Sequence, residues 1–166
     1  MAPSGQALAA AITAEIAPES APVIELGPGS GAFTRALIDR GIPQHRLALI
    51  EQSPRFALAL RERFPDARVL CADAAALDCI DVFSGEDAGA VVSGLPLLLM
   101  SPDKVSAILA SAFKQLRPGA AFYQFTYGSR SPVPRPILER LGLTATRIGR
   151  TLANMPPAAV YRLSAG

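Results

Sequence analysis

The sequence is poor in the residues that build metal centres and disulfide frameworks. It contains two cysteines, Cys71 and Cys79, and one histidine, His45. Cysteines in this number and spacing match neither a disulfide framework nor a zinc site, so we expect free thiols in a reducing compartment. His45 precedes a predicted strand, and we assign it no catalytic role. The sequence therefore predicts chemistry that needs no metal ion.

Long apolar runs are also missing. The longest, Leu95–Met100, is far shorter than the roughly 18 residues that a membrane-spanning helix needs. The N-terminus does not combine a basic stretch with an apolar one, as a secretory signal peptide would. With 166 residues, 50% of them apolar, the chain can bury a core without cross-links. We therefore expect one domain over residues 1–166, monomeric, cytoplasmic and at most peripherally attached to the inner face of the membrane.

Acidic residues are scarce in the last third of the chain. Residues 104–166 hold nine arginines and lysines and a single acid, Glu139, whereas residues 1–103 hold seven basic and thirteen acidic residues. The formal net charge of +2 hides this asymmetry. A basic segment points to a partner with phosphates, either an anionic membrane surface or nucleic acid. A solvated basic face without a partner is the alternative.

What the chain does have is a regular alternation of short apolar runs and helical patterns, which is typical of parallel strands joined by crossover helices. The predicted strands are 23–26, 47–50, 68–71, 88–93, 120–127, 143–152 and 159–163. The predicted helices are 5–17 with Ser4 as cap, 30–40, 54–64, 102–116 and 136–141. We therefore predict an α/β fold with a doubly wound, Rossmann-like seven-stranded sheet whose last two strands form a hairpin.

The first predicted strand runs into a glycine-rich turn, Glu25-Leu26-Gly27-Pro28-Gly29-Ser30-Gly31. Alternate glycines let the backbone turn tightly and approach a ligand closely. The helix that follows offers free N–H groups at its start, as in dinucleotide sites. Taken alone, the pattern is equally compatible with a plain turn between a strand and a helix.

Polar residues end the next strands at the same edge of the predicted sheet. Glu51 ends the second strand, where an acid binds ribose hydroxyls in doubly wound folds. Asp73 follows the third strand, where its carboxylate can accept from an adenine amine. The segment 93–96 ends the fourth strand beside the same crevice. The alternatives are a surface glutamate at position 51 and a helix cap for residues 74–78 at Asp73.

These segments, each at the end of a successive strand, resemble the motifs of class I methyltransferases that use S-adenosylmethionine (SAM), and the likeness covers nearly the whole chain. It implies a mostly parallel sheet with an antiparallel last strand, and S-adenosylhomocysteine as the product of the cofactor. Glu25 would orient the methionine part above the glycines, Glu51 would hold the ribose, and Asp73 with Ala74 the adenine. The implied cofactor residues are Glu25, Gly27, Gly29, Ser30, Gly31, Thr34, Glu51, Gln52, Asp73, Ala74 and Ser93.

The later segments resemble bacterial phospholipid N-methyltransferases, which methylate the amine of phosphatidylethanolamine, up to three times, toward phosphatidylcholine. The likeness rests on 92–97, 123–128, 131–135 and 150–158. These enzymes are similar to ribosomal RNA adenine dimethyltransferases, whose fourth motif carries asparagine before a Leu/Ile-Pro pair and an aromatic after it. Here Ser93 stands in place of the asparagine and Leu97 in place of the aromatic, which argues against a flipped base as the acceptor. A phospholipid substrate, and no nucleic acid, is therefore expected.

The residues expected to act on the acceptor are Ser93, Gly94, Leu95, Pro96 and Tyr127. An alkyl ammonium has a pKa near 10, so a dry site with oriented hydrogen-bond acceptors is needed to favour the neutral amine. The hydroxyl and carbonyls around position 93 would accept from it, and the tyrosine would orient it or relay its proton.

Three further residues, Tyr123, Arg130 and Arg135, are expected at the headgroup. Aromatic faces hold methylated ammonium groups, and guanidinium groups bind phosphate. The alternatives are a core position for the tyrosine and a solvated loop for the two arginines. Arg147 and Arg150 alternate with apolar neighbours and are expected to line a sheet surface.

One departure from the lipid family concerns membrane docking. Members often carry a longer amphipathic N-terminal helix, whereas here no arginine or lysine precedes Arg35, and a helix over 5–17 is a weak anchor. Two alternatives follow: the N-terminus is trimmed in this sequence, or docking relies on the basic C-terminal third. Two other hypotheses stay open: a methyltransferase acting on RNA or a small amine, and a SAM-binding module without catalysis or a nucleotide-binding protein of another type.

Overall fold

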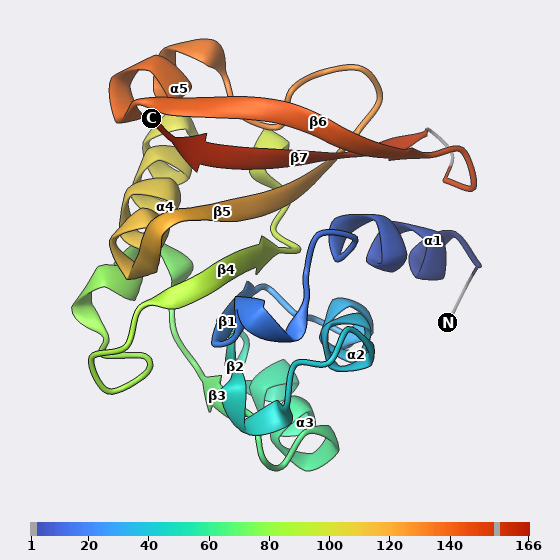
Figure 1. The fold of residues 1–166 in the computed structure, drawn as a ribbon, viewed down its shortest axis with the longest axis vertical. Coiled ribbons are helices and arrows are strands. Elements are labelled where there is room, and N and C mark those ends of the chain that lie inside the picture. The colour runs from blue at the N-terminus through green and yellow to red at the C-terminus, as the bar shows by residue number, and fades with distance from the viewer. Residues whose placement is uncertain (1–2, 155–156) are drawn as a thin grey trace.

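The computed structural model describes residues 3–154 and 157–166 (Figure 1). In these residues seven strands form one sheet in the order β3-β2-β1-β4-β5-β7-β6. Neighbouring strands are parallel except where β7 pairs with β5 and β6. The predicted α/β sheet with an antiparallel last strand is confirmed. The strands are β1 (Val23–Leu26), β2 (Leu47–Ile50), β3 (Arg68–Leu70), β4 (Ala88–Ser93), β5 (Leu116–Tyr127), β6 (Leu143–Thr151) and β7 (Ala158–Ala165).

Helices cover both faces of this sheet and bury an apolar cluster on each. One cluster joins the sheet to α1, α2 and α3, and the other joins it to α4, α5 and η3. Side chains alternate between the faces, as they must along a strand, so that Val23 packs in the first cluster and Ile24 in the second. The helices are α1 (Pro3–Ile12), α2 (Ala32–Asp39), α3 (Pro54–Arg63), α4 (Pro102–Gln115) and α5 (Arg135–Leu141), with short 3-10 turns η1 (Pro18–Ser20), η2 (Gln44–Arg46), η3 (Ala74–Cys79) and η4 (Leu97–Leu99).

The helices that border the predicted site begin where the sequence indicates. Ser53 caps α3 by accepting a hydrogen bond from the Phe56 N–H at 3.4 Å, and proline occupies the first turn. Ser101 caps α4 in the same way through the Lys104 N–H at 3.2 Å. These caps fix the first turns of α3 and α4 just beyond the ends of the strands.

The first helix and the fifth strand have boundaries that differ from the predicted ones. The first helix begins at Pro3, so Ser4 lies inside it, and it ends at Ile12 instead of 17. Arg40, the C-cap residue of α2, donates to the Ala10 carbonyl at 3.1 Å and so satisfies an acceptor of the last turn of α1. The fifth strand begins at Leu116 and not at 120, because a register shift opposite β4 accommodates the Pro118-Gly119 pair within the strand.

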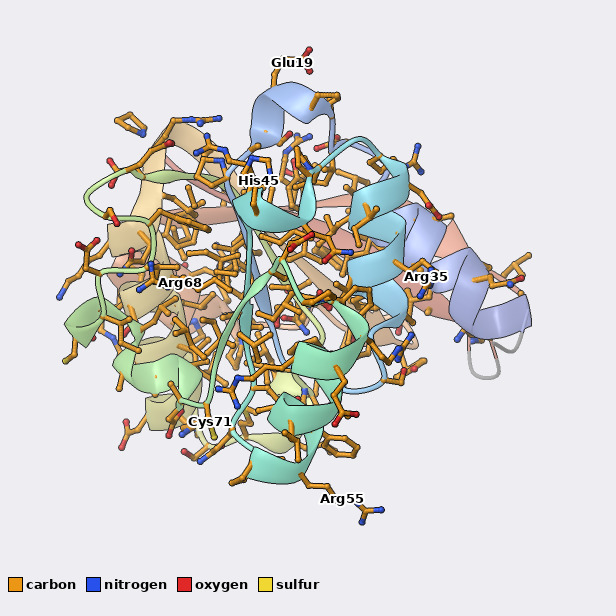
Figure 2. The ribbon with its side chains drawn as sticks, turned by 90° about the horizontal axis from the view of Figure 1, so that it is seen from below. Glu19, Arg35, His45, Arg55, Arg68 and Cys71 are labelled. Carbon is orange, nitrogen blue, oxygen red and sulfur yellow. The ribbon has the colours of Figure 1, made fainter. Side chains whose placement is uncertain are left out.

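The predicted motifs and His45 lie at opposite ends of the parallel strands. Figure 2 places His45 and Glu19 at one end of the molecule and Arg55 and Cys71 at the opposite end, where the parallel strands finish. The sequence-predicted motifs all follow strand ends, so His45 lies at the edge away from them. Among the described residues, no helix has the length and apolarity to cross a bilayer.

Candidate active site

A cleft of about 470 Å³ opens at the edge where β1, β2, β3 and β4 end. Its volume suits a nucleoside-sized ligand. Each of the four strand ends contributes, and the first turns of α3 and α4 complete the walls. Nine of the residues predicted from the sequence line it together: Gly27, Gly29, Glu51, Gln52, Asp73, Ala74, Gly94, Leu95 and Pro96.

Glu51 joins the second strand end to the glycine turn. Its carboxylate accepts from the Gly29 N–H at 3.2 Å and from the Ser53 N–H at 2.9 Å. The side chain is 8% exposed, so it is not a free surface glutamate. A carboxylate oxygen can accept two hydrogen bonds, so each oxygen of Glu51 keeps capacity for a neighbouring hydroxyl group. This geometry fits the ribose of the predicted cofactor.

Asp73 caps η3, as one of the two alternatives from the sequence has it, and it also lines the cleft. Its carboxylate accepts from the Ala75 N–H at 2.9 Å, which caps η3, and it lines the cleft. The ammonium of Lys104 on α4 bonds its other oxygen. This bond, helped by the one from Ala75, lowers the pKa of Asp73. Lys104 also lines the cleft, and the local sequence contains no signal for it because the pair is 31 residues apart.

Glu25 lies beneath the site, between β1 and α2. It is fully buried, and Thr34 of α2 donates to its Oε1. Burial raises the pKa of Glu25 to about 8, although the Thr34 bond opposes this, and the charge of Glu51 raises it further. Its Oε2 has no hydrogen-bond partner among the described residues. An acid with one unpartnered oxygen fits a ligand ammonium, such as that of the methionine part of SAM.

The turns after β1 and β4 touch each other, and glycine makes this possible. Gly27 has φ +62°, and a Cβ there would lie 2.6 Å from Leu95 Cδ2. A Cβ on Gly94 would lie 2.8 Å from the Gly27 carbonyl oxygen. A side chain at either position would therefore force the two turns apart.

Two residues of the glycine turn face elsewhere. Gly31 precedes α2 and packs against the Phe64 ring, where a Cβ would come within 2.9 Å. The Ser30 carbonyl accepts from the Arg63 guanidinium. Neither residue lines the cleft, and neither does Thr34, which acts on Glu25. The structure thus gives these three predicted cofactor residues supporting positions.

The turn after β4 is fixed by a residue that sequence reasoning missed. Gln124 of β5 donates from Nε2 to the Leu95 carbonyl at 2.7 Å, and its Oε1 is buried without a partner among the described residues. Ser93 is also fully buried, and its hydroxyl oxygen accepts from the Leu95 N–H at 3.2 Å. Ser93 therefore shapes the turn and does not line the cleft. The sequence signal that could have identified Gln124 is a polar amide in the middle of a predicted apolar strand.

Tyr123 is a correction to the predicted headgroup set. It is buried in the cluster under α1, and its hydroxyl donates to Glu15 Oε1 at 3.0 Å. Burial and the Glu15 carboxylate raise the pKa of this phenol. The alternative of a core position applies, because both the ring and the hydroxyl are already engaged.

The other predicted acceptor residues lie beyond the cleft. Tyr127 ends β5 half-exposed, edge-on to the Phe125 ring with centroids 5.4 Å apart. Arg130 is exposed in the loop after β5, and Arg135 pairs with Glu139 at 2.8 Å on α5. None of the three predicted residues lines the 470 Å³ cleft.

A separate pocket of about 280 Å³ lies beside the end of β5. It is lined by Arg147 and Arg150 of β6, by Gly128 and Ser129, and by the start of β7. The two arginines expected to line a plain sheet surface are therefore brought into one hollow. The alternation of Arg147 and Arg150 with apolar residues does not predict this pocket, because Gly128 and Ser129 of the loop after β5 form part of its wall.

Comparisons with known proteins match this arrangement. The chain is 38% identical over 109 residues to the ornithine lipid N-methyltransferase of Singulisphaera acidiphila, covering 63% of this chain and 56% of that protein. It is 36% identical over 100 residues to ribosomal RNA small subunit methyltransferase A of Rhodopseudomonas palustris, covering 55% and 34%. The chain thus matches little more than half of the first relative's length and about a third of the second's.

Solved structures share the fold at low sequence identity. The glycopeptide N-methyltransferase MtfA superposes with a TM-score of 0.75 at 17% identity, over 98% of this chain and 90% of that chain. A second structure of that enzyme, complexed with SAM, gives 0.69 at 16% identity, over 98% and 94%. Residues 23–119, more than half of the chain and all four strand-end motifs, match the family model described as a methyltransferase domain. The chain therefore belongs to the methyltransferase domain family, and its cofactor is S-adenosylmethionine.

Proposed function

We propose that this domain transfers the methyl group of SAM to the amine nitrogen of an aminolipid headgroup, with phosphatidylethanolamine as the first acceptor. The observation that carries the proposal is the turn after β4. Leu97, which stands where the RNA enzymes carry a stacking aromatic, is 3% exposed and packs in the core under α4. The turn therefore offers a flipped base no ring to stack on. The similarity to a lipid N-methyltransferase supports the same conclusion.

For this methyl transfer the protein mainly has to orient the amine toward the methyl group and keep water out of the site. SAM supplies a methyl group on a sulfonium: the amine lone pair forms the new N–C bond, and the electrons of the broken C–S bond stay on sulfur. The amine must arrive neutral, and it loses one proton to solvent as it is methylated. One buried acceptor beside the turn, Gln124 Oε1, lacks a partner among the described residues, while its Nε2 bonds the Leu95 carbonyl; such an oxygen suits an amine N–H group.

A second acceptor, the ornithine headgroup, is favoured by one comparison. The relative at 38% identity is named for ornithine lipid. An ornithine headgroup also presents an alkyl amine, so the same turn and the same in-line displacement would serve it. Only the group attached beyond the amine differs, a carboxylate in place of a phosphate.

The test is transfer of label from methyl-labelled SAM. The protein is incubated with vesicles of phosphatidylethanolamine, with vesicles containing ornithine lipid, with vesicles of phosphatidylcholine, which has no free amine, and with ribosomal RNA. We expect label in the extracted phosphatidylethanolamine and none in phosphatidylcholine. Label in ornithine lipid alone would replace the first acceptor by the second. Label in RNA alone would overturn the lipid proposal.

A further inference from the structure

Exposed large apolar side chains gather at the edge of the sheet where the cleft opens. Among the described residues six such side chains are exposed, and one of them, Phe56, lines the cleft itself. Four more form a group that we call the apolar rim: Leu98, Leu99, Tyr127 and Leu152. Leu99 is 86% exposed and Leu152 73% exposed, so neither contributes much to the core. The sixth, Leu58, lies on α3, about 200° around the helix from Phe56.

The topology places the rim residues at one edge although they are far apart in the sequence. Leu98 and Leu99 follow β4, Tyr127 ends β5, and Leu152 follows β6. Strands β4, β5 and β6 run in the same direction, because β7 is antiparallel to both β5 and β6. In Figure 1 these three strands run from left to right and finish on the side of the molecule where the β6–β7 hairpin projects. Apolar groups concentrated at one exposed edge indicate an interaction surface.

The charge beside the rim is positive. Arg147 and Arg150 line the 280 Å³ pocket that follows Tyr127, and Arg130 is exposed in the adjoining loop. The only acid after residue 103, Glu139, already pairs with Arg135. Leucines flanked by guanidinium groups match a lipid surface, where the apolar groups enter the acyl boundary and the cations meet phosphates. Single-stranded RNA is instead gripped by stacking aromatic rings, and the rim contains one ring among four side chains.

We propose that the apolar rim and the Arg147–Arg150 pocket form a docking surface for an anionic bilayer, with the cleft opening toward the lipid headgroups. The proposal rests on the proposed function and adds how the acceptor is reached: the lipid amine enters the cleft without its acyl chains leaving the membrane. Docking in this manner uses strand-end loops of the catalytic domain itself and needs no separate anchoring helix.

The experiment is flotation with vesicles of phosphatidylglycerol and phosphatidylethanolamine, compared with vesicles of phosphatidylcholine alone. We expect the wild-type chain to float with the anionic vesicles and to detach as salt is raised. The double variant Leu99→Ser, Leu152→Ser should lose at least about tenfold in affinity, because two apolar side chains no longer enter the lipid. Leu58→Ser, at a leucine that is 59% exposed on α3, is the control and should float like wild type. The pair Arg147→Gln, Arg150→Gln should bind more weakly and with a flatter salt dependence.

Methyl transfer to phosphatidylethanolamine in detergent micelles separates this proposal from the one on which it rests. The double serine variant should keep wild-type transfer there, because micelles deliver the lipid without a bilayer. Vesicle binding that depends on the rim, without transfer to any lipid, would support the docking surface and overturn the proposed acceptor. Equal flotation of the double serine variant and Leu58→Ser would overturn the docking surface. So would arginine-dependent binding to ribosomal RNA with no binding to vesicles.

Discussion

The substitution Glu25→Gln tests how the site handles charge. Glu25 is fully buried, has a pKa of about 8, and has one oxygen bonded to Thr34 and one without a partner among the described residues. Glutamine keeps the shape and can still accept from Thr34, but it does not titrate. The two proteins should therefore differ only where the charge of residue 25 matters.

The sign of the effect on stability follows from the raised pKa. Between pH 4.5 and 8 the folded protein retains a proton on Glu25 that the unfolded chain has lost. The free energy of unfolding of the cofactor-free protein should therefore fall as pH rises through this window and level off above it. At 1.36 kcal/mol per unit, the contribution of this residue is about 5 kcal/mol across the window. Glu25→Gln should lack this slope and be the more stable protein at pH 8.5.

For SAM binding we expect the wild type, and not Glu25→Gln, to be the better protein. The ammonium of SAM favours the ionised carboxyl, so binding at pH 7 should release close to one proton from wild type and none from Glu25→Gln. Losing a charge-assisted hydrogen bond should weaken SAM binding about ten- to a hundredfold. Urea unfolding at pH 5, 7 and 8.5 measures the first effect, and calorimetry in two buffers of different ionisation enthalpy measures the second. Equal pH slopes for the two proteins would refute the reasoning.

Three other substitutions have defined outcomes. Gly94→Ala places a methyl group 2.8 Å from the Gly27 oxygen, so we expect a lower melting temperature and SAM binding weakened at least about tenfold by calorimetry. Lys104→Met removes the partner of Asp73, and because both groups are about one-third exposed, urea unfolding at pH 7 should change by no more than about 1 kcal/mol; a loss of several kcal/mol would contradict this. Tyr123→Phe removes the bond to Glu15 and should cost about 1 kcal/mol of stability while methyl transfer stays at the wild-type rate. A large loss of methyl transfer in Tyr123→Phe would contradict the core position and support the predicted role of Tyr123 at the headgroup.

The part of the site that could be predicted from the sequence is the part that topology dictates. Parallel strands all end at one edge, so residues directly after successive strands must converge there. This is why Gly27, Glu51, Asp73 and Gly94 could be grouped without coordinates, and the structure places them in one cleft. The supporting role of Gly31, against Phe64, could not be distinguished from a lining role by motif alone.

The parts that could not be predicted depend on contacts between distant segments. Lys104 reaches Asp73 across 31 residues, and Tyr123 reaches Glu15 across 108. No periodicity records such a pairing. The start of β5 differs from the predicted start for a related reason. In the sequence Pro118-Gly119 indicates the end of an element, whereas in the structure Leu116 already pairs with Ala88 of β4. The pocket around Arg147 likewise exists only once the loop after β5 is in place.

The most direct test of a single SAM pocket built from four strand ends is a calorimetric titration of SAM into wild type and Glu51→Ala. Glu51 connects the second strand end to the glycine turn through Gly29, so its loss removes the expected ribose contact and this connection together. We expect wild type to bind one SAM per chain and Glu51→Ala to bind at least about tenfold more weakly, with an unchanged circular dichroism spectrum. Equal affinity of the two proteins for SAM, or no binding by wild type, would contradict the account.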